Sequence, residues 1–182
     1  MTNFRLPGDL SPKEFMAQLL RVDHAGEYGA KYIYEGQLKV IKDPQARQKI
    51  QHMAEQEQEH LDFFDEQLVK HRVRPSLLAP LWRNGGRLMG AATALLGANT
   101  AMACTEAVEE VIDNHYQEQL EQLPDTKEYA KLKAKISKFR DDEVEHRQTA
   151  LDSGAEQAPL HNVLTWGIKI VTRLAIEVAK KV

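Results

Sequence analysis

Two Glu-x-x-His pairs are the residues of this chain best suited to chemistry. One consists of Glu57 and His60, and the other of Glu143 and His146. Because residues three positions apart lie on the same face of a helix, each pair could present a carboxylate and an imidazole to one metal ion. One such pair alone is equally compatible with an exposed helix surface, so the surrounding apolar pattern has to decide between the two interpretations.

Both pairs interrupt an apolar stripe of helical period. The first stripe consists of Ile50, Met53, Phe64 and Leu68. The second consists of Leu132, Ile136, Phe139 and Ala150. Because such a stripe faces the core of an amphipathic helix, both carboxylates and both imidazoles are expected to point inward.

The same periodicity selects one glutamate in each of two other segments. Glu27, and not Glu35, lies on the stripe of its segment, which consists of Met16, Leu20, Asp23, Ala30, Tyr34 and Ile41. Glu109, and neither Glu106 nor Glu110, lies on the stripe of Met102, Thr105, Ile112, Tyr116, Leu120 and Leu123. Glu106 and Glu110 are expected on a solvated face. The predicted inward set is Glu27, Glu57, His60, Glu109, Glu143 and His146.

Four buried carboxylates require compensation. Without it, each would cost several kcal/mol or take up a proton. Two divalent ions would balance the four negative charges, and the neutral imidazoles would complete their coordination. Oxygen-rich ligation with one imidazole per ion suits iron or manganese and lacks the thiolates of many zinc sites. The pattern is that of the di-iron and di-manganese carboxylate bundles, in which two helices each supply a Glu and two supply Glu-x-x-His.

Further side chains are candidates for hydrogen bonds to these ligands: Asp23, His24, His115, Tyr116 and Asp142. Asp142 directly precedes Glu143 and could accept the ring N–H of a ligand histidine. An acid on the helix surface is the alternative for Asp142, and an ordinary core or surface histidine is the alternative for His115.

The elements that must position these residues are all expected to be helices. A capping box, Ser11-Pro12-Lys13-Glu14, starts the first. Residues 72 to about 90 contain Pro75, Pro80, Gly85 and Gly86, which favours a long crossover with short helical pieces. Long helices are expected from Pro12 to about Ile41, from Pro44 to about His71, from about residue 90 to about Leu123, after Pro124-Asp125 to about Asp152, and over residues 160–181.

The predicted fold is an all-α, ferritin-like four-helix bundle with one long crossover and an additional amphipathic helix. The chain has 182 residues, which suits a single domain over residues 1–182. Its net charge of -3 gives no reason to expect a nucleic-acid partner. Cys104 is the only cysteine, which excludes a disulfide framework and a Cys-rich zinc site.

Two segments are basic and apolar at once. Between Gln67 and Thr105 there is no acidic residue, while the basic residues are Lys70, Arg72, Arg74, Arg83 and Arg87. The last helix carries an apolar stripe of Leu160, Val163, Leu164, Gly167, Ile168, Val171, Leu174 and Val178. Such segments are too short or too polar to span a bilayer, but they can lie in an anionic membrane interface. Packing on the bundle, or on a second copy in a homo-oligomer, is the alternative.

Several strings of this sequence resemble the demethoxyubiquinone hydroxylase family: Arg21–Ala30, Arg72–Pro75, Pro80–Trp82, Thr93–Gly97, Ala101–Thr105, Val108–Glu110, His115–Tyr116 and Phe139–His146. The similarity covers the chain from about residue 15. The resemblance implies a membrane-associated di-iron monooxygenase that hydroxylates a polyprenylated methoxy-benzoquinol late in ubiquinone synthesis. It also assigns the iron ligands to the same six residues that the helical periodicity selects.

The resemblance implies cofactors, partners and a location. Two iron ions, O2 and an external electron donor are expected, with NADH as a candidate, although the chain has no Gly-x-Gly-x-x-Gly fingerprint. Expected partners are the quinol, a membrane surface and other proteins of ubiquinone biosynthesis. The expected location is peripheral, on the cytoplasmic face of a bacterial inner membrane or the matrix face of the mitochondrial inner membrane.

Other functions remain open on the same bundle. A di-iron peroxidase or catalase is one alternative, and a non-catalytic lipid-quinone carrier with a vestigial site is another. An iron-storage subunit is disfavoured because storage needs acidic nucleation surfaces, whereas the crossover is basic and free of acids.

Overall fold

The computed structural model describes residues 10–182, which contain six α-helices, one short 3-10 helix and no strand. The prediction of an all-α fold is therefore confirmed. The elements are α1 (Pro12–Val40), α2 (Pro44–His71), α3 (Ala79–Leu95), α4 (Ala98–Gln122), α5 (Ala130–Asp152), η1 (Ala155–Gln157) and α6 (His161–Ala179).

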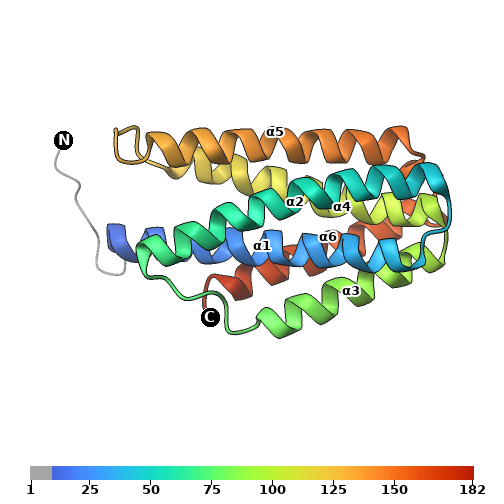
Figure 1. The fold of residues 1–182 in the computed structure, drawn as a ribbon, viewed down its shortest axis with the longest axis horizontal. Helices are drawn as coiled ribbons and strands as arrows, with labels where there is room; N and C mark the ends of the chain where they lie inside the picture. The colour runs from blue at the N-terminus through green and yellow to red at the C-terminus, as the bar shows by residue number, and fades with distance from the viewer. Residues whose placement is uncertain (1–9) are drawn as a thin grey trace.

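Four long helices form the bundle, and two more helices cover it (Figure 1). Helix α1 packs on α2, and α4 packs on α5, while α3 lies along α1 and α6 lies along α4. The connection from α2 to α4 runs through α3, as the predicted crossover requires. The pairs α1–α2 and α4–α5 together place four helix faces around one interior.

Helix starts follow the predicted capping chemistry. The hydroxyl of Ser11 accepts the backbone N–H of Glu14, and the Glu14 carboxylate accepts that of Ser11. Asp43 likewise accepts the backbone N–H of Ala46 at the start of α2, where Pro44 takes the first helical position. Each cap satisfies N–H groups that have no partner within the helix.

The crossover differs from the prediction. It is one continuous 17-residue helix instead of short pieces, and α4 starts at Ala98 instead of about residue 90. The break between the two helices comes at Gly97, whose φ of 117° is costly for any residue with a side chain.

Of the two glycines expected to interrupt the crossover, Gly86 is a contact point in the structure, whereas a Cβ atom at Gly85 would meet nothing within 4 Å. A Cβ atom at Gly86 would lie 2.8 Å from the carbonyl oxygen of Gly29, and one at Gly90 would overlap the carbonyl of Ile33. On the facing helix, a Cβ atom at Gly36 would overlap the carbonyl of Arg87. The backbones of α1 and α3 therefore touch, and this close packing outweighs the low helix propensity of glycine.

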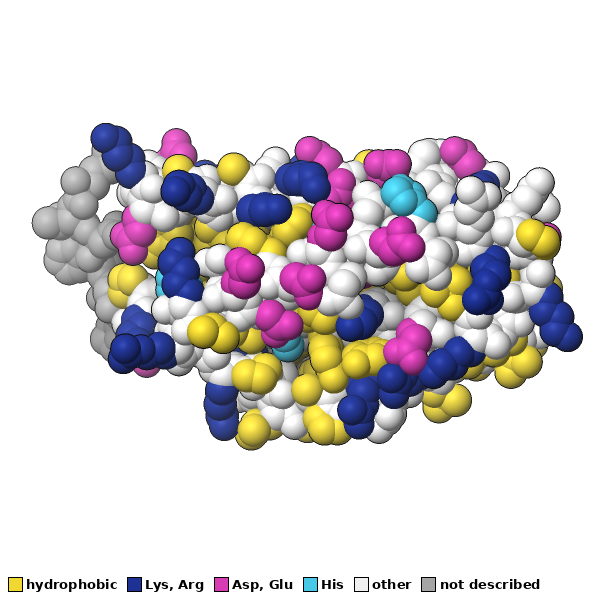
Figure 2. Space-filling model, viewed as in Figure 1, with side chains coloured by type: hydrophobic (Ala, Val, Ile, Leu, Met, Phe, Trp, Pro, Cys, Tyr) yellow, Lys and Arg dark blue, Asp and Glu magenta, His cyan; other side chains and the backbone are white. Residues whose placement is uncertain are grey.

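Acidic side chains gather apart from a region that is both hydrophobic and basic on the surface in Figure 2. Acidic side chains lie over α2, and hydrophobic and basic side chains lie together along α3. Exposed large hydrophobic residues of the crossover segment and α3 are Leu77, Leu81, Leu88 and Leu95. Those at the start of α6 and along it are Leu160, Val163, Trp166, Val171, Leu174 and Val178. Most of the predicted apolar stripe of α6 thus faces outward, while Thr165 and Ile168 are buried.

Candidate metal centre

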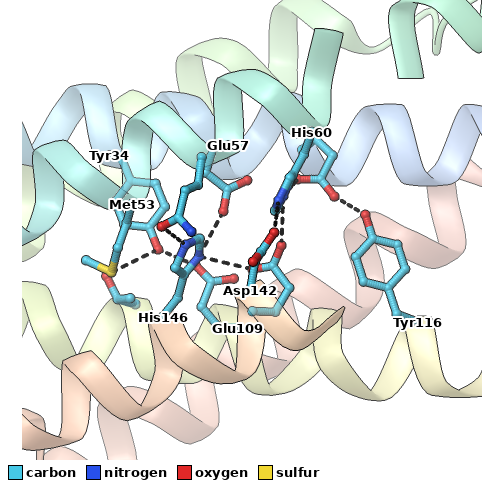
Figure 3. Close-up of polar contacts among 12 residues, drawn as sticks. Tyr34, Met53, Glu57, His60, Glu109, Tyr116, Asp142 and His146 are labelled. Carbon is cyan, nitrogen blue, oxygen red and sulfur yellow. Dashed lines mark hydrogen bonds and ion pairs between the residues drawn. The ribbon is translucent and has the colours of Figure 1, made fainter. Parts of the chain in front are cut away.

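The six predicted ligands converge in the middle of the bundle (Figure 3). Helix α1 supplies one glutamate, α4 supplies another, and α2 and α5 each supply a Glu-x-x-His pair. All six side chains are at most 1% exposed, so the inward orientation expected from periodicity is observed for Glu27, Glu57, His60, Glu109, Glu143 and His146. Apolar core residues lie on either side of them, with Phe64 and Phe139 in one cluster and Ile50 and Met102 in the other.

The six residues form two overlapping groups. Ligand atoms of Glu27, Glu57, His60 and Glu143 all lie within 4.8 Å of one another. The same holds for Glu57, Glu109, Glu143 and His146. Because Glu57 and Glu143 belong to both groups, the arrangement suits two metal ions bridged by two carboxylates, each with one further carboxylate and one imidazole.

The imidazole rings present one nitrogen to the centre and the other away from it. Nδ1 of His60 lies 3.4 Å from Glu27 Oε2 and 3.2 Å from Glu143 Oε1. Nδ1 of His146 lies 3.2 Å from Glu57 Oε1 and 3.3 Å from Glu143 Oε2. Nδ1 is therefore the nitrogen that faces the centre on both rings, which leaves Nε2 free to contact an outer side chain.

Most of the oxygen and nitrogen atoms that face the centre lack a hydrogen-bond partner, as expected for atoms that bind a metal ion. Both oxygens of Glu57 and Glu143, one oxygen of Glu27 and of Glu109, and Nδ1 of both histidines are buried without a hydrogen-bond partner among the described residues. Leaving so many polar atoms unsatisfied would cost about 1–3 kcal/mol each. Divalent ions would satisfy all of them at once, so the residues present fit two metals.

Outer side chains contact four of the six predicted ligands. The hydroxyl of Tyr116 donates to Glu27 Oε1, and that of Tyr34 donates to Glu109 Oε1 at 2.6 Å. Nε2 of His60 lies 3.1 Å from Asp142 Oδ2. Nε2 of His146 lies 3.1 Å from Oε1 of Gln56. Tyr116 and Asp142 thus contact ligands as predicted.

Tyr34 and Gln56 were not predicted as neighbours of the ligands. Gln56 directly precedes Glu57, as Asp142 precedes Glu143, so the correspondence of the two Glu-x-x-His pairs could have revealed it. Tyr34 lies on the inward stripe of α1, two turns after Glu27, but that position does not distinguish it from an ordinary core tyrosine.

Three other predicted neighbours make no contact with a ligand. Asp23 lies 3.1 Å from Nε2 of His115 and accepts a hydrogen bond from Gln119. Nε2 of His24 lies 3.0 Å from Asp65, an exposed residue of α2. His24 is itself buried, and this contact joins α1 to α2.

The predicted solvated face of α4 is partly covered. Glu106 is buried, and Nε2 of His161 lies 2.6 Å from its carboxylate. Glu110 is half-buried and pairs with Arg147 at 2.9 Å and Lys169 at 2.7 Å. The prediction for Glu106 was wrong because α6 packs on this face of α4, which the periodicity of α4 alone does not reveal.

The metal-free centre retains protons. Burial raises the pKa of Glu57 well above its ordinary value, and neighbouring carboxylates raise it further. Burial and Glu143 also raise the pKa of Glu109. Burial opposes ionisation of Glu143 itself, but His146 and His60 lower its pKa to about 2. Burial alone would lower the pKa of His60, whereas the facing carboxylates raise it to about 12. Binding of metal would displace these protons.

The sequence of the chain matches a known protein family. The family model described as ubiquinone biosynthesis protein COQ7 matches residues 14–179. The chain belongs to the COQ7 family. This match confirms the resemblance of the sequence segments to the demethoxyubiquinone hydroxylase family.

Relatives of this COQ7-family chain cover most of its length. It is 48% identical over 179 residues to a 3-demethoxyubiquinol 3-hydroxylase of Rhodospirillum rubrum. This alignment covers 98% of this chain and 84% of the relative. It is 47% identical over 166 residues to the human protein named NADPH-dependent 3-demethoxyubiquinone 3-hydroxylase, mitochondrial. This alignment covers 90% of this chain and 76% of the relative. A mitochondrial 5-demethoxyubiquinone hydroxylase of Saccharomyces cerevisiae is 42% identical over 183 aligned positions, covering 92% of this chain and 78% of the relative.

An apolar cavity of about 450 Å³ adjoins the centre of this COQ7-family chain. Its walls come from α1, α3, α4 and α6, and almost all of its lining is apolar. At one end the lining includes the ligand Glu27 and its partner Tyr116. At the other it includes Leu81, Leu88 and Val171, each more than half exposed. The cavity therefore connects one metal position to the surface between α3 and α6.

Proposed function

We propose that this chain is an O2-dependent monooxygenase that hydroxylates a polyprenylated methoxy-benzoquinol, demethoxyubiquinol, in ubiquinone biosynthesis. The observation that carries the proposal is the apolar cavity that reaches from the surface to Glu27 and Tyr116. Its relatives are named for this reaction or its quinone form. A bundle built for peroxide alone would have no need of an apolar cavity of this size.

The six inward residues would hold two iron ions, which supply the activation of O2. Glu57 and Glu143 would bridge the ions, because both carboxylates belong to both groups of donors. Glu27 with His60 would complete one position, and Glu109 with His146 the other. An oxygen-rich set with one imidazole per ion supports iron over zinc or copper.

Hydroxylation by O2 also consumes two electrons and two protons, since the second oxygen atom leaves as water. These electrons would come from an external donor. Several relatives are named NADPH-dependent, which supports a nicotinamide nucleotide, NADH or NADPH, as the source. The chain has no Gly-x-Gly-x-x-Gly fingerprint, so such a donor would act without a dinucleotide-binding domain.

The cavity would orient the substrate. Its apolar walls would exclude bulk water from the reacting ring, and the few polar side chains at its inner end would face the ring substituents. Tyr116 holds the carboxylate of Glu27 through its hydrogen bond, which keeps the ligand at the inner end of the cavity in one orientation. The isoprenoid tail would leave through the opening beside Leu88 and Val171.

The exposed apolar edge along α3 and α6 would rest on a membrane. Trp166 and Leu174 on α6 and Leu81 and Leu88 on α3 are exposed, and both helices contribute to the walls of the cavity. In the part of the chain that the structure describes, no helix is long and apolar enough to cross a bilayer. Interfacial binding by amphipathic helices with basic residues nearby would bring the opening to the depth at which a polyprenylated quinol resides.

The proposal is tested by a single-turnover experiment. The metal-free protein is loaded with ferrous iron under anaerobic conditions, mixed with demethoxyubiquinol bearing a short tail, and exposed to 18O2. The expected result is about two bound iron ions per chain and a product that has gained one oxygen atom. The product should be 16 mass units heavier than the substrate with 16O2 and 18 mass units heavier with 18O2.

Two results would contradict the proposal in different ways. Failure to bind iron, with quinol still bound, would indicate a carrier with a vestigial site. Binding of two iron ions with consumption of peroxide but no labelled quinol would indicate a peroxidase or catalase. Glu109→Ala serves as the matched variant that should bind less iron and form no labelled product.

A further inference from the structure

The metal centre is nearly symmetric in its outer contacts. Each terminal glutamate accepts a tyrosine hydroxyl, Glu27 from Tyr116 and Glu109 from Tyr34. Each imidazole presents Nδ1 to the centre and Nε2 to the side chain that precedes a bridging glutamate on the opposite helix pair. The pairs α1–α2 and α4–α5 each carry a lone glutamate followed by Glu-x-x-His, which accounts for this correspondence.

The symmetry breaks at one pair of residues. The partner of His60 is the carboxylate of Asp142, at 3.1 Å, while the partner of His146 is the amide of Gln56, also at 3.1 Å. The side chain of Asp142 is only 15% exposed. Lys138 lies 3.5 Å from the same carboxylate oxygen, but its side chain is 57% exposed and its charge is largely screened by water. One imidazole therefore has an anionic partner and the other a neutral one.

This difference changes how strongly each imidazole binds a cation. A ring N–H that donates to a carboxylate leaves more electron density on the other nitrogen than one that donates to an amide, because the charge-assisted hydrogen bond is about twice as strong. Such partners commonly change metal affinity by about 10–100-fold. Nδ1 of His60 is therefore the better donor of the two.

We infer that the two metal positions are unequal, and that Asp142 and Gln56 are the positioning residues that rank them. The position of Glu27 and His60 binds a divalent ion more tightly and fills first, and the position of Glu109 and His146 fills second. This inference rests on the proposed ligand set and adds an order of filling to it.

The ranking matches the location of the cavity. Glu27 lines the cavity that would hold the substrate, whereas Glu109 does not. The tightly held ion is therefore the one beside the substrate, and the weakly held ion lies deeper in the bundle. Partial loss of metal would empty the position remote from the cavity first.

The test is a calorimetric titration of the full-length, metal-free protein with Co2+, which needs no O2 and no turnover. The wild-type chain should bind two ions in two steps that differ by about tenfold or more in affinity. Asp142→Asn should weaken the first step by about tenfold, and Gln56→Glu should strengthen the second by a similar factor. At one equivalent of Co2+, anomalous diffraction should show the ion beside His60 in the wild type and beside His146 in the double variant.

Matched controls are available next to each residue. Asp141→Asn and Glu55→Gln change the same chemical groups at exposed neighbouring positions and should leave both steps unchanged. A gain of affinity in Gln56→Glu cannot result from poor folding, so it separates a positioning role from a structural one.

Three outcomes would overturn the inference. Two equal steps in the wild type would do so, as would a Gln56→Glu variant whose second step is unchanged, and both would leave the ligand set intact. Binding of fewer than two Co2+ ions by the wild type would instead remove the proposed ligand set, and the ranking with it.

Discussion

The phenolic hydroxyl of Tyr34 on α1 donates a 2.6 Å hydrogen bond to Glu109 on α4. This bond joins the two helices inside the bundle. Both side chains are at most 1% exposed. The neighbouring sulfur of Met53 is the only other polar contact recorded for this hydroxyl among residues 10–182. The bond thus holds a terminal ligand that the metal-free bundle would otherwise leave unpartnered.

Tyr34→Phe should therefore destabilise the metal-free protein. Loss of one buried hydrogen bond is expected to cost about 1 kcal/mol, which lowers the melting temperature by about 2–4 °C for a domain of this size. Calorimetric melting of the metal-free protein measures it. Tyr32→Phe is the control, since Tyr32 is only partly buried and its ring contacts Arg87 instead of a ligand. Equal melting temperatures for wild type and Tyr34→Phe would contradict the expected role.

Substitutions of inward and outward residues should differ in their effect on the iron content. Glu109→Ala or His60→Ala should abolish hydroxylation and lower the iron content, because each removes a donor atom. Glu110→Ala should change neither, because Glu110 pairs with Arg147 and Lys169 near the surface and such pairs contribute about 0–1 kcal/mol. Iron analysis of purified variants decides it, with Glu35→Ala as a second control. Loss of iron in Glu110→Ala with retention in Glu109→Ala would reverse the assignment.

The metal-free protein should become more stable as the pH falls from about 7.5 to about 5.5. Burial raises the pKa of Glu57 and Glu109, and facing carboxylates raise the pKa of His60 and His146 despite burial. The native state then binds more protons than the unfolded state over this range, so lowering the pH favours folding. The gain ends near the ordinary Glu value of 4.5, because the unfolded chain takes up the same protons there. Below it, Glu143, with a pKa of about 2, opposes further gain.

Iron loading should reverse this dependence, since protons then compete with metal for the same atoms. The iron-loaded protein should melt at a higher temperature at about pH 7.5 than at about pH 5.5. Melting curves of both forms across this range, recorded without O2, provide the measurement. Parallel pH profiles for the two forms would mean that the glutamates do not share a metal site.

The exposed face of α6 should contribute to membrane binding. The double substitution Trp166→Ser and Leu174→Ser removes two exposed apolar side chains that do not line the cavity. Because each would bury apolar area in the interface, the variant should bind anionic liposomes at least about tenfold more weakly. Liposome sedimentation measures it. Val69→Ser, at an exposed apolar position on α2, should bind like the wild type. Unchanged sedimentation of the double variant would leave this face without a role at the membrane.

Substituting exposed residues of α6 is a more specific test of membrane binding than deleting the helix. Helix α6 packs on α4, and its first residue, His161, pairs with the buried Glu106. Deletion would expose that carboxylate and remove the buried Ile168 from the core, so lost membrane binding could not be separated from a damaged bundle.

The amino-acid sequence by itself determined the identity of the inward ligands. Helical period places Glu27 and Glu109 on apolar stripes and sets Glu35 and Glu110 off them, because side chains three or four positions apart share one helix face. It also placed the capped starts of α1 and α2, since Ser11 and Asp43 bond to backbone groups within three residues. These features depend on local geometry, which the order of residues specifies directly.

Only the tertiary structure decided the features that depend on a second element. Gly86 looks like a helix breaker until α1 lies against it, and Glu106 looks solvated until α6 covers it. The pairing of His60 with Asp142 and of His146 with Gln56 joins α2 to α5 across about 80 to 90 residues of chain. No local pattern specifies such contacts, because they arise from which helix faces are brought together when the bundle packs.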